Sequence, residues 1–360
     1  MVFDPGVPYD DLPRLPPAGD VESKAVLRQA LRATRALAEL KGAGGLIPDQ
    51  AILINAIPLQ EAKASSEIEN IVTTQDELYR AASDETAVTD PQTKEVLRYR
   101  TALRQGYEAL KRKKLSLDMI LQVCQTLRGE PVAFRGRDEQ VHIGNRTTGR
   151  VTYTPPRGGR SLQPMLRNLE AYLLGSDGPD PLIRMAVAHY QFEAIHPFAD
   201  GNGRTGRILN ILYLLHAGLL EIPVLYLSRF IIQQKRDYYR ALRAVTEDAA
   251  WEPWVLYMLH GVEETSRWTV GRIRAIRDLL DATVERCRAE LPKVYSKELV
   301  ELVFRSPYCK ISFVVEAGIA ERKTASVYLQ ELERIGVLQA EKRGREMIYR
   351  HPALLKVLTA

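Results

Sequence analysis

The sequence contains few cysteines and no repeats. Its three cysteines, Cys124, Cys287 and Cys309, lie far apart in a chain of 360 residues and form no CxxC pair. They are too few to hold such a chain together by disulfides, so a reducing, cytoplasmic compartment is predicted. The chain also shows no internal repeat and no low-complexity tract.

Targeting and membrane signals are also lacking. Residues 1–20 are rich in proline and aspartate and have neither a basic start nor an apolar core, which argues against a secretory signal. The longest apolar stretch, residues 208–227, is interrupted by Asn210, His216, Gly218, Glu221 and Pro223. This pattern favours a buried helix and a loop, so we predict no membrane segment.

The remaining composition is that of an ordinary globular protein with a mildly basic tail. Hydrophobic side chains make up 45% of the 360 residues, enough for a substantial core in two or three domains. The formal net charge is +5, and residues 291–360 hold 12 Lys+Arg against 8 Asp+Glu. This bias permits contact with nucleic acid without demanding it.

Apolar residues recur at helical spacing along most of the chain, which predicts a mainly α fold without a large sheet. Asp20 is the expected N-cap of a first helix that ends at the Gly42–Gly45 break. A second helical pattern follows Pro48 and covers residues 52–71, and another starts at residue 73. Long helical patterns then follow Pro91 and cover residues 161–215 and 228–290. We expect an N-terminal helical region at 1–112, a core at 113–275 and a tail domain at 290–360.

One strand pair is predicted before the tail. Residues 141–143 and 150–154 have strand-forming sequences and flank the turn-prone stretch Gly144–Gly149. Pro155 and Pro156 then end the second strand. This pattern predicts a small β-hairpin within an otherwise helical core.

The chemistry is concentrated in the run HPFADGNGRTGR at residues 196–207, which leads into an apolar helix. A glycine-rich loop before a helix presents unpaired backbone N–H groups and the positive end of the helix dipole to an anion. Asn202 adds an amide donor, and Arg204 and Arg207 add charged donors. A polyphosphate is therefore the expected ligand.

Two further residues of the run supply reactive groups. Asp200 is an oxygen ligand for Mg²⁺, which proteins hold with one or two carboxylates together with substrate phosphates. His196 is the candidate general base, because an imidazole can take a proton from an attacking hydroxyl near neutral pH. Taken singly, an HPF triplet is usually a packed loop and a Gly-x-Gly before a helix is usually a cap. Their combination favours chemistry.

The run matches every specified position of HxFx(D/E)GNGRxxR, and by it the chain resembles the Fic family over roughly residues 10–270. The resemblance implies a Fic-type helical bundle in which His196 deprotonates a Ser, Thr or Tyr hydroxyl of a target protein while Asp200 binds Mg²⁺. The hydroxyl attacks the α-phosphate of ATP in line and pyrophosphate leaves, as in a protein adenylyltransferase. In the implied ATP site, Gly201, Asn202 and Gly203 form the anion hole, Arg204 and Arg207 hold the β- and γ-phosphates, and Thr205 and Gly206 lie between them.

The hairpin resembles the flap that covers the nucleotide in this family and docks a target segment by strand addition. The implied docking residues are His142, Ile143, Gly144, Thr152 and Tyr153. A purely structural hairpin is the alternative. Further along, residues 236–239 resemble the segment that places an aromatic ring beside adenine, which implies Tyr239; packing in the core is the alternative for this tyrosine.

Residues 65–70, SSEIEN, resemble the inhibitory motif (S/T)xxxE(G/N) of members with an inhibitory helix before the core, here about residues 52–71. Ser65 and Glu69 lie one helical turn apart on one face. The resemblance implies that Glu69 pairs with Arg207 and repels the γ-phosphate, so that ATP binds only in a non-productive pose. The motif is short, and a solvated helix face is the alternative. Because this glutamate orients water in some relatives, removal of AMP is an implied second activity.

The tail from Ser296 shows three helical segments and then strand-like residues 337–340 and 347–350 around a turn at Arg343–Gly344. This order is expected of a winged helix-turn-helix.

DNA is one candidate ligand of this tail. Lys323, Ser326 and Gln330 are expected on the exposed face of its second helix, as in a DNA reader. Glu331 and Glu333 oppose phosphate contact, and winged helices also bind proteins, so both interpretations stay open.

Two functions of different classes fit these features. The first is an AMP-transferring enzyme restrained by Glu69, with a protein target that includes the chain itself and with a homodimer implied by the resemblance. The second is a nucleotide-sensing, DNA-binding transcriptional regulator, which would have little use for an intact His196. Relatives of this fold also transfer phosphate, UMP or phosphocholine; intact Arg204 and Arg207 favour an AMP donor.

Overall fold

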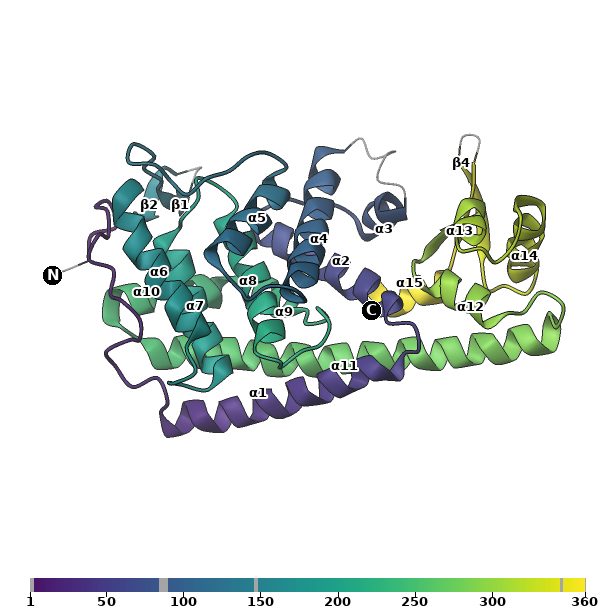
Figure 1. Cartoon of the computed structure of the whole chain (residues 1–360), viewed down its shortest axis with the longest axis horizontal. Coiled ribbons are helices and arrows are strands. Elements are labelled where there is room, and N and C mark those ends of the chain that lie inside the picture. The colour runs from purple at the N-terminus through teal and green to yellow at the C-terminus, as the bar shows by residue number, and fades with distance from the viewer. Residues whose placement is uncertain (1–2, 84–89, 146–147, 344–345, 360) are drawn as a thin grey trace.

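The computed structural model describes residues 3–83, 90–145, 148–343 and 346–359, which form a mainly helical protein (Figure 1). The N-terminal helices are α1 (Lys24–Ala43), α2 (Ala51–Ile68), α3 (Gln75–Ser83) and α4 (Pro91–Leu110). The middle part consists of α5 (Leu117–Arg128), β1 (Ile143–Asn145), β2 (Arg150–Tyr153), α6 (Leu162–Leu174), α7 (Pro181–Ile195), α8 (Asn202–His216), α9 (Leu227–Gln233) and α10 (Lys235–Asp248). After α11 (Trp251–Glu290) come α12 (Lys297–Phe304), β3 (Tyr308–Lys310), α13 (Ile311–Glu316), α14 (Arg322–Arg334), β4 (Gln339–Arg343), β5 (Glu346–Arg350) and α15 (Pro352–Thr359). The mainly α class predicted from the spacing is confirmed.

Helices α1 and α11 lie side by side along one edge of the molecule and support the rest (Figure 1). The N-cap of α1 is Ser23, whose hydroxyl accepts from the Val26 N–H at 3.3 Å, so the prediction of Asp20 is wrong. Asp20 lies outside the helix and accepts from the Glu22 N–H instead. The 40-residue α11 runs without a break through the expected boundary at residue 275.

The centre of the fold is the pair α7 and α8, both buried on nearly all sides. Helix α7 starts with the Asp180 cap and Pro181, a favoured first-turn combination. It ends at His196, whose φ of +50° is in the left-handed region, and α8 begins after Gly201 at φ +83°. The loop that carries the predicted chemistry therefore connects two core helices and is bounded by two left-handed residues.

Helix α2 ends at Ile68, with Glu69 as its C-cap and Asn70 at φ +64°, so it is shorter than predicted. Asparagine tolerates this conformation better than other non-glycine residues. The helix is attached to its neighbours through the buried Glu61, whose carboxylate accepts from the Ser228 N–H at 2.9 Å and the Tyr99 hydroxyl at 3.0 Å. Burial raises the pKa of Glu61.

Replacing Glu61 with Ala should lower the free energy of unfolding by about 3 kcal/mol, because it leaves the buried Ser228 and Tyr99 donors without a partner. Urea unfolding followed by circular dichroism measures the change. The control is Glu67→Ala on the same helix. The Glu67 carboxylate pairs with Lys63 near the surface, so its loss should lower the free energy of unfolding by less than about 0.5 kcal/mol. Equal stability of Glu61→Ala and wild type would contradict the anchoring role.

The predicted hairpin is present, but its first strand covers Ile143–Asn145 and so begins two residues later than the predicted 141–143. Strands β1 and β2 pair antiparallel, with Ile143 opposite Tyr153 and Gly144 opposite Val151. A Cβ atom on Gly144 would clash with the Arg150 carbonyl oxygen, so glycine permits this close pairing. Residues 146–147 of the expected turn lie outside the described residues. The Tyr153 hydroxyl donates to the Ala194 carbonyl at 2.8 Å and attaches the hairpin to α7.

The tail contains the three predicted helices and the predicted strand pair, with β3 and α15 in addition. Its sheet is antiparallel in the order β3-β5-β4, and Gly344 of the expected turn lies outside the described residues. Lys323 and Gln330 are exposed as expected, whereas Ser326 is half-buried. Whether these elements act as a winged helix-turn-helix stays a prediction.

Specific contacts join the tail to the N-terminal helices. Gln60 of α2 donates to the Leu358 carbonyl of α15 at 2.5 Å, and the Tyr308 hydroxyl of β3 bonds to Asp76 of α3. Figure 1 shows α15 beside α2 in the middle of the molecule. Within the described ranges, no helix combines the length and apolar character that crossing a membrane requires.

Candidate active site

A cavity of about 1380 Å³ lies among the 196–203 loop, the end of α2, the hairpin and α10. A space of this size can hold a nucleotide together with part of a second substrate. Most of the residues singled out from the sequence line it: His142, Ile143, Gly144, Thr152, Tyr153, His196, Asp200, Gly201, Asn202, Gly203, Arg204, Arg207, Tyr239 and Glu69. The structure therefore brings four separate segments of the sequence to one site.

His196 is held at the end of α7 by backbone contacts. Its N–H donates to the Phe192 carbonyl at 3.0 Å, and its own carbonyl accepts from Arg135 Nε at 2.8 Å. The ring atom Nδ1 lies 3.3 Å from the Glu193 carbonyl oxygen, which assigns the proton to Nδ1 and leaves the Nε2 lone pair as the acceptor. Burial lowers the pKa of His196 to about 4, so the imidazole is neutral near pH 7.

The side chain of Asn202 bonds to the backbone of its own loop. Its Oδ1 accepts from the Phe198 N–H and its Nδ2 donates to the Phe198 carbonyl, both at 2.8 Å. The carboxamide is 2% exposed and bonds within the loop through its oxygen and one of its two N–H groups, so its role as a donor toward an anion stays a prediction. The start of α8, after Gly201, has no side-chain cap, and a helix start presents backbone N–H groups that favour an anion.

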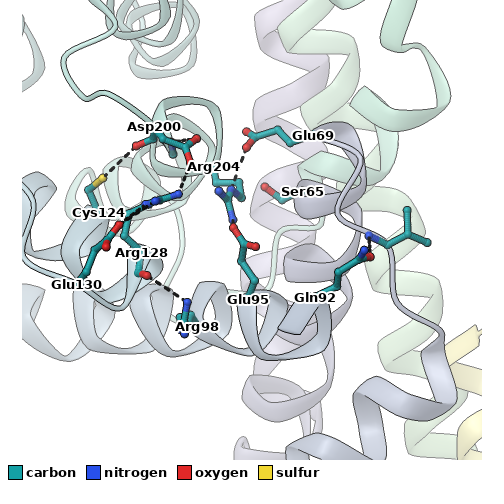
Figure 2. A network of polar contacts seen from close by, with 12 residues as sticks. Ser65, Glu69, Gln92, Glu95, Arg98, Cys124, Arg128, Glu130, Asp200 and Arg204 are labelled. Carbon is teal, nitrogen blue, oxygen red and sulfur yellow. Dashed lines mark hydrogen bonds and ion pairs between the residues drawn. The ribbon is translucent and has the colours of Figure 1, made fainter. Parts of the chain in front are cut away.

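Glu69 contacts both arginines of the signature, and Figure 2 shows its contact with Arg204. Its Oε1 accepts from Arg207 Nη2 at 2.7 Å and its Oε2 accepts from Arg204 Nε at 2.9 Å. The predicted pair between Glu69 and Arg207 is present, and the contact with Arg204 adds to it. A Cβ atom on Gly203 would lie 2.5 Å from Glu69 Oε1, so the glycine makes room for this carboxylate.

Each arginine also has a partner of its own. Arg207 Nε donates to Ser65 Oγ at 2.7 Å and Nη2 donates to the Ser65 carbonyl at 2.9 Å. Arg204 Nη1 donates to Glu95 of α4 at 2.5 Å. Arg204 is 1% exposed and Arg207 is 3% exposed, so these counter-charges offset the cost of burying two cations.

Thr205 and Gly206 do not line the cavity, although the resemblance places them in the ATP-binding segment. Residues 203, 204 and 207 share one face of α8 because they are three and four positions apart, and 205 and 206 fall on the opposite side. Thr205 is 1% exposed. A Cβ atom on Gly206 would lie 2.6 Å from Glu193 Oε1, so this glycine accommodates α7.

Asp200 has an acceptor group at the cavity and could contribute to a cation site. Its side chain is 53% exposed, accepts from the Gly201 N–H at 2.7 Å, and pairs with Arg128 of α5, which also contacts Glu130 (Figure 2). Among the described residues, no three His, Cys, Asp or Glu side chains are grouped as a metal site. Mg²⁺ fits such a position, because it commonly keeps water and substrate phosphates beside a single carboxylate.

The opposite wall of the cavity is formed by the hairpin and α10. Tyr239 is 46% exposed, whereas its neighbour Tyr238 is buried and bonded to His189 at 2.8 Å. Tyr239 is therefore the member of this pair that a ligand can reach. In the hairpin, Thr152 donates to the Ile143 carbonyl at 3.0 Å and stiffens the strand pair.

Three charged residues of the site were not predicted from the sequence. Glu95 contacts Arg204 across 109 positions and Arg128 contacts Asp200 across 72 positions, so no local pattern marks either of them. Glu193 lies one turn before His196, and its Oε1 is buried without a hydrogen-bond partner. Burial, with the charge of Glu69 adding to it, raises the pKa of Glu193 to about 7.

Family models match three parts of the chain. Residues 27–108 match the Fic/DOC family N-terminal model, and residues 114–214 match the Fic/DOC family model. Residues 279–354 match the C-terminal domain of protein adenylyltransferase SoFic-like. The match at residues 114–214 contains the whole signature run at residues 196–207.

Curated relatives are similar to less than half of this chain. The chain is 29% identical over 170 residues to protein adenylyltransferase fic-1 of Caenorhabditis elegans, covering 46% of this chain and 30% of the relative. It is 30% identical over 157 residues to protein adenylyltransferase Fic of Drosophila grimshawi, covering 42% and 29%. The match thus spans about a third of the length of these relatives.

Solved structures share the fold. A Fic family protein from Desulfovibrio desulfuricans G20 superposes with a TM-score of 0.58 at 20% identity, covering 92% of this chain and 96% of that one. Fic-1 from C. elegans superposes with a TM-score of 0.53 at 21% identity, covering 69% and 74%.

Proposed function

The chain carries the N-terminal and Fic domains of the Fic/DOC family, and on this premise we propose that it is a protein adenylyltransferase restrained by Glu69. It transfers AMP from ATP to a Ser, Thr or Tyr hydroxyl of a protein. The observation that carries the proposal is that His196, Asp200 and both arginines face one cavity at the start of α8. The curated relatives named protein adenylyltransferases support it.

In the proposed reaction, Nε2 of His196 accepts the proton of the target hydroxyl. The hydroxyl oxygen forms a bond to the α-phosphorus of ATP, the bond from that phosphorus to the bridging oxygen breaks, and pyrophosphate leaves with the electron pair. Backbone N–H groups at the start of α8 and the two arginines then face the negative charge of the phosphates. Tyr239 lines the same cavity, and it is the residue proposed to contact the adenine.

Asp200 is the residue that would hold Mg²⁺, and the ion would offset the charge of the phosphates. Arg128 pairs with the same carboxylate in this structure, so it must give up that contact or share it when a cation binds.

The restraint follows from the contacts of Glu69. Its carboxylate is bonded to both arginines that the reaction needs for the triphosphate. An anionic ligand at the same place would be repelled by the Glu69 carboxylate and could not pair with either arginine. Glu69 must therefore leave before the triphosphate can bind both arginines.

The test uses the Glu69→Gly protein with Mg²⁺ and ATP labelled at either the α- or the γ-phosphate. We expect α-label on protein and a mass increase of one AMP, without γ-label. Retained γ-label would indicate phosphate transfer and contradict the proposal. Absence of both labels despite ATP binding and added lysate targets would favour the nucleotide-sensing regulator.

The pH dependence follows from the lowered pKa of His196, about 4 through burial. Only the neutral imidazole can accept the proton, and the neutral form is lost only as the pH falls through that pKa. Transfer by Glu69→Gly should therefore stay level from about pH 8 to about pH 6 and fall below about pH 5. Initial rates in buffers of constant ionic strength measure this; a midpoint near 6.5, the ordinary histidine value, would contradict it.

We further propose that the target can be the chain itself, that the protein forms a homodimer, and that it acts in the cytoplasm. The proposed units are residues 1–112, the catalytic core at 113–275 and a winged helix-turn-helix domain at 290–360. DNA binding by this tail and removal of AMP stay predictions.

A further inference from the structure

Arg204 lies between two carboxylates, and only one of them belongs to the proposed inhibitory motif. Figure 2 shows Glu69 on one side of Arg204 and Glu95 of α4 on the other. The Nε atom bonds to Glu69 at 2.9 Å and Nη1 bonds to Glu95 at 2.5 Å. The two contacts use different atoms of the guanidinium, so the loss of one leaves the other intact.

The two carboxylates are held in different ways. Glu69 is the C-cap at the end of α2, followed by left-handed Asn70. Glu95 is in the second turn of α4, next to Val96, which is fully buried. Helix α4 also packs closely on α8, the helix of Arg204, since a Cβ atom on Gly106 would lie 2.7 Å from the Leu212 side chain. Glu95 therefore keeps its place relative to Arg204 when the end of α2 moves.

Arg207, like Arg204, has one partner of its own and one that both arginines share. Arg207 is held by Ser65 through two bonds and shares Glu69 with Arg204. Each arginine thus has a separate anchor, Ser65 or Glu95, and Glu69 is the partner common to both. An arginine as buried as Arg204 needs a counter-charge when Glu69 leaves, and a bond at Nη1 fixes the plane of its guanidinium.

We propose that Glu95 is a positioning residue, which keeps the Arg204 guanidinium directed at the phosphates of ATP after Glu69 has left. The inference rests on the proposed function, since Arg204 is taken to bind the triphosphate. With Glu69 displaced, Glu95 balances one of the two arginine charges, and the site keeps a net positive charge for the anion. If Glu95 acted instead as a second lock, its removal would improve ATP binding.

The experiment measures ATP binding and AMP transfer in the Glu69→Gly background. Isothermal titration gives the Kd for ATP, and initial transfer rates give kcat and KM. Glu95→Ala should raise Kd and KM about tenfold and leave kcat within about twofold, because a charged hydrogen bond that orients a binding group is lost. Glu95→Gln should recover most of the affinity, since its amide oxygen can accept from Nη1. The control is Glu108→Ala on the same helix, which removes a surface pair with Lys111 and should change neither constant.

Unchanged or tighter ATP binding by Glu95→Ala, with an unfolding midpoint equal to that of its parent, would overturn the inference. If Glu95→Ala does not fold, Glu95→Gln takes its place, and tighter binding than the parent would overturn it equally. Failure of the parent Glu69→Gly protein to bind ATP would instead contradict the proposed function, so the two failures are distinguishable.

Discussion

Exchanging Glu69 for Gly should raise the rate of AMP transfer about a hundredfold, equivalent to about 2.7 kcal/mol. The Glu69 carboxylate bonds to Arg204 at 2.9 Å and to Arg207 at 2.7 Å, and hydrogen bonds between charged groups contribute about 1.5–3 kcal/mol each. Removing it frees both arginines for the triphosphate and removes a negative charge from the site. Label incorporation from α-labelled ATP, with initial rates for both proteins, measures the ratio.

The matched control for this experiment is Glu67→Gly. Glu67 is in the last turn of α2, two positions before Glu69, and its carboxylate pairs with Lys63 at 3.1 Å near the surface. Its exchange should leave the rate within about twofold of wild type, because surface pairs contribute little. A Glu69→Gly protein that folds normally and transfers AMP no faster than wild type would sink the restraint model.

Exchanging His196 for Ala in the Glu69→Gly background should lower the transfer rate by at least about a hundredfold, while ATP still binds. General bases contribute about 10² to 10⁴ in rate, and Nε2 of His196 is the neutral acceptor at the cavity. The α8 start and the arginines are untouched by this change, so affinity for ATP should remain within about threefold. Transfer rates together with isothermal titration separate the two effects.

His260→Ala supplies the control for this second experiment. His260 is on the exposed side of α11 and its Nδ1 lies 2.7 Å from the Leu256 carbonyl oxygen, so its loss should leave both transfer and binding unchanged. A His196→Ala protein that binds ATP and transfers AMP within tenfold of its parent would show that another group removes the proton. Glu193, one turn earlier on α7, would then be the next residue to test.

The features predicted correctly depend on residues close together in the chain. The helices follow from apolar spacing over three or four positions, and the hairpin follows from two strand-forming runs around a glycine-rich turn. The signature run placed His196 and Asp200 correctly at the cavity. The pairing of Glu69 with Arg207 came from a family motif rather than from any local property of residues 65–70.

The differences arise where a polar group chooses among several partners. The Asn202 side chain bonds to Phe198 through its oxygen and one N–H group, a loop contact that the sequence did not predict. Asp20 is a good N-cap residue, but the N-cap of helix α1 is Ser23, three residues later. In both places the sequence contains a side chain that can form the predicted hydrogen bond, and the local backbone conformation determines which hydrogen bonds it forms.

The sequence by itself determined that this chain is mainly helical and that it carries the glycine-containing run 196–207 with a histidine, an acid and two arginines. Only the tertiary structure decided which charges meet, since Arg204 takes its second carboxylate from Glu95, 109 positions away. The physical reason is one of range: spacing and turn chemistry act over a few residues, whereas ion pairs form wherever packing brings two helices together. The close contact of α4 with α8 at Gly106 is what places Glu95 beside Arg204.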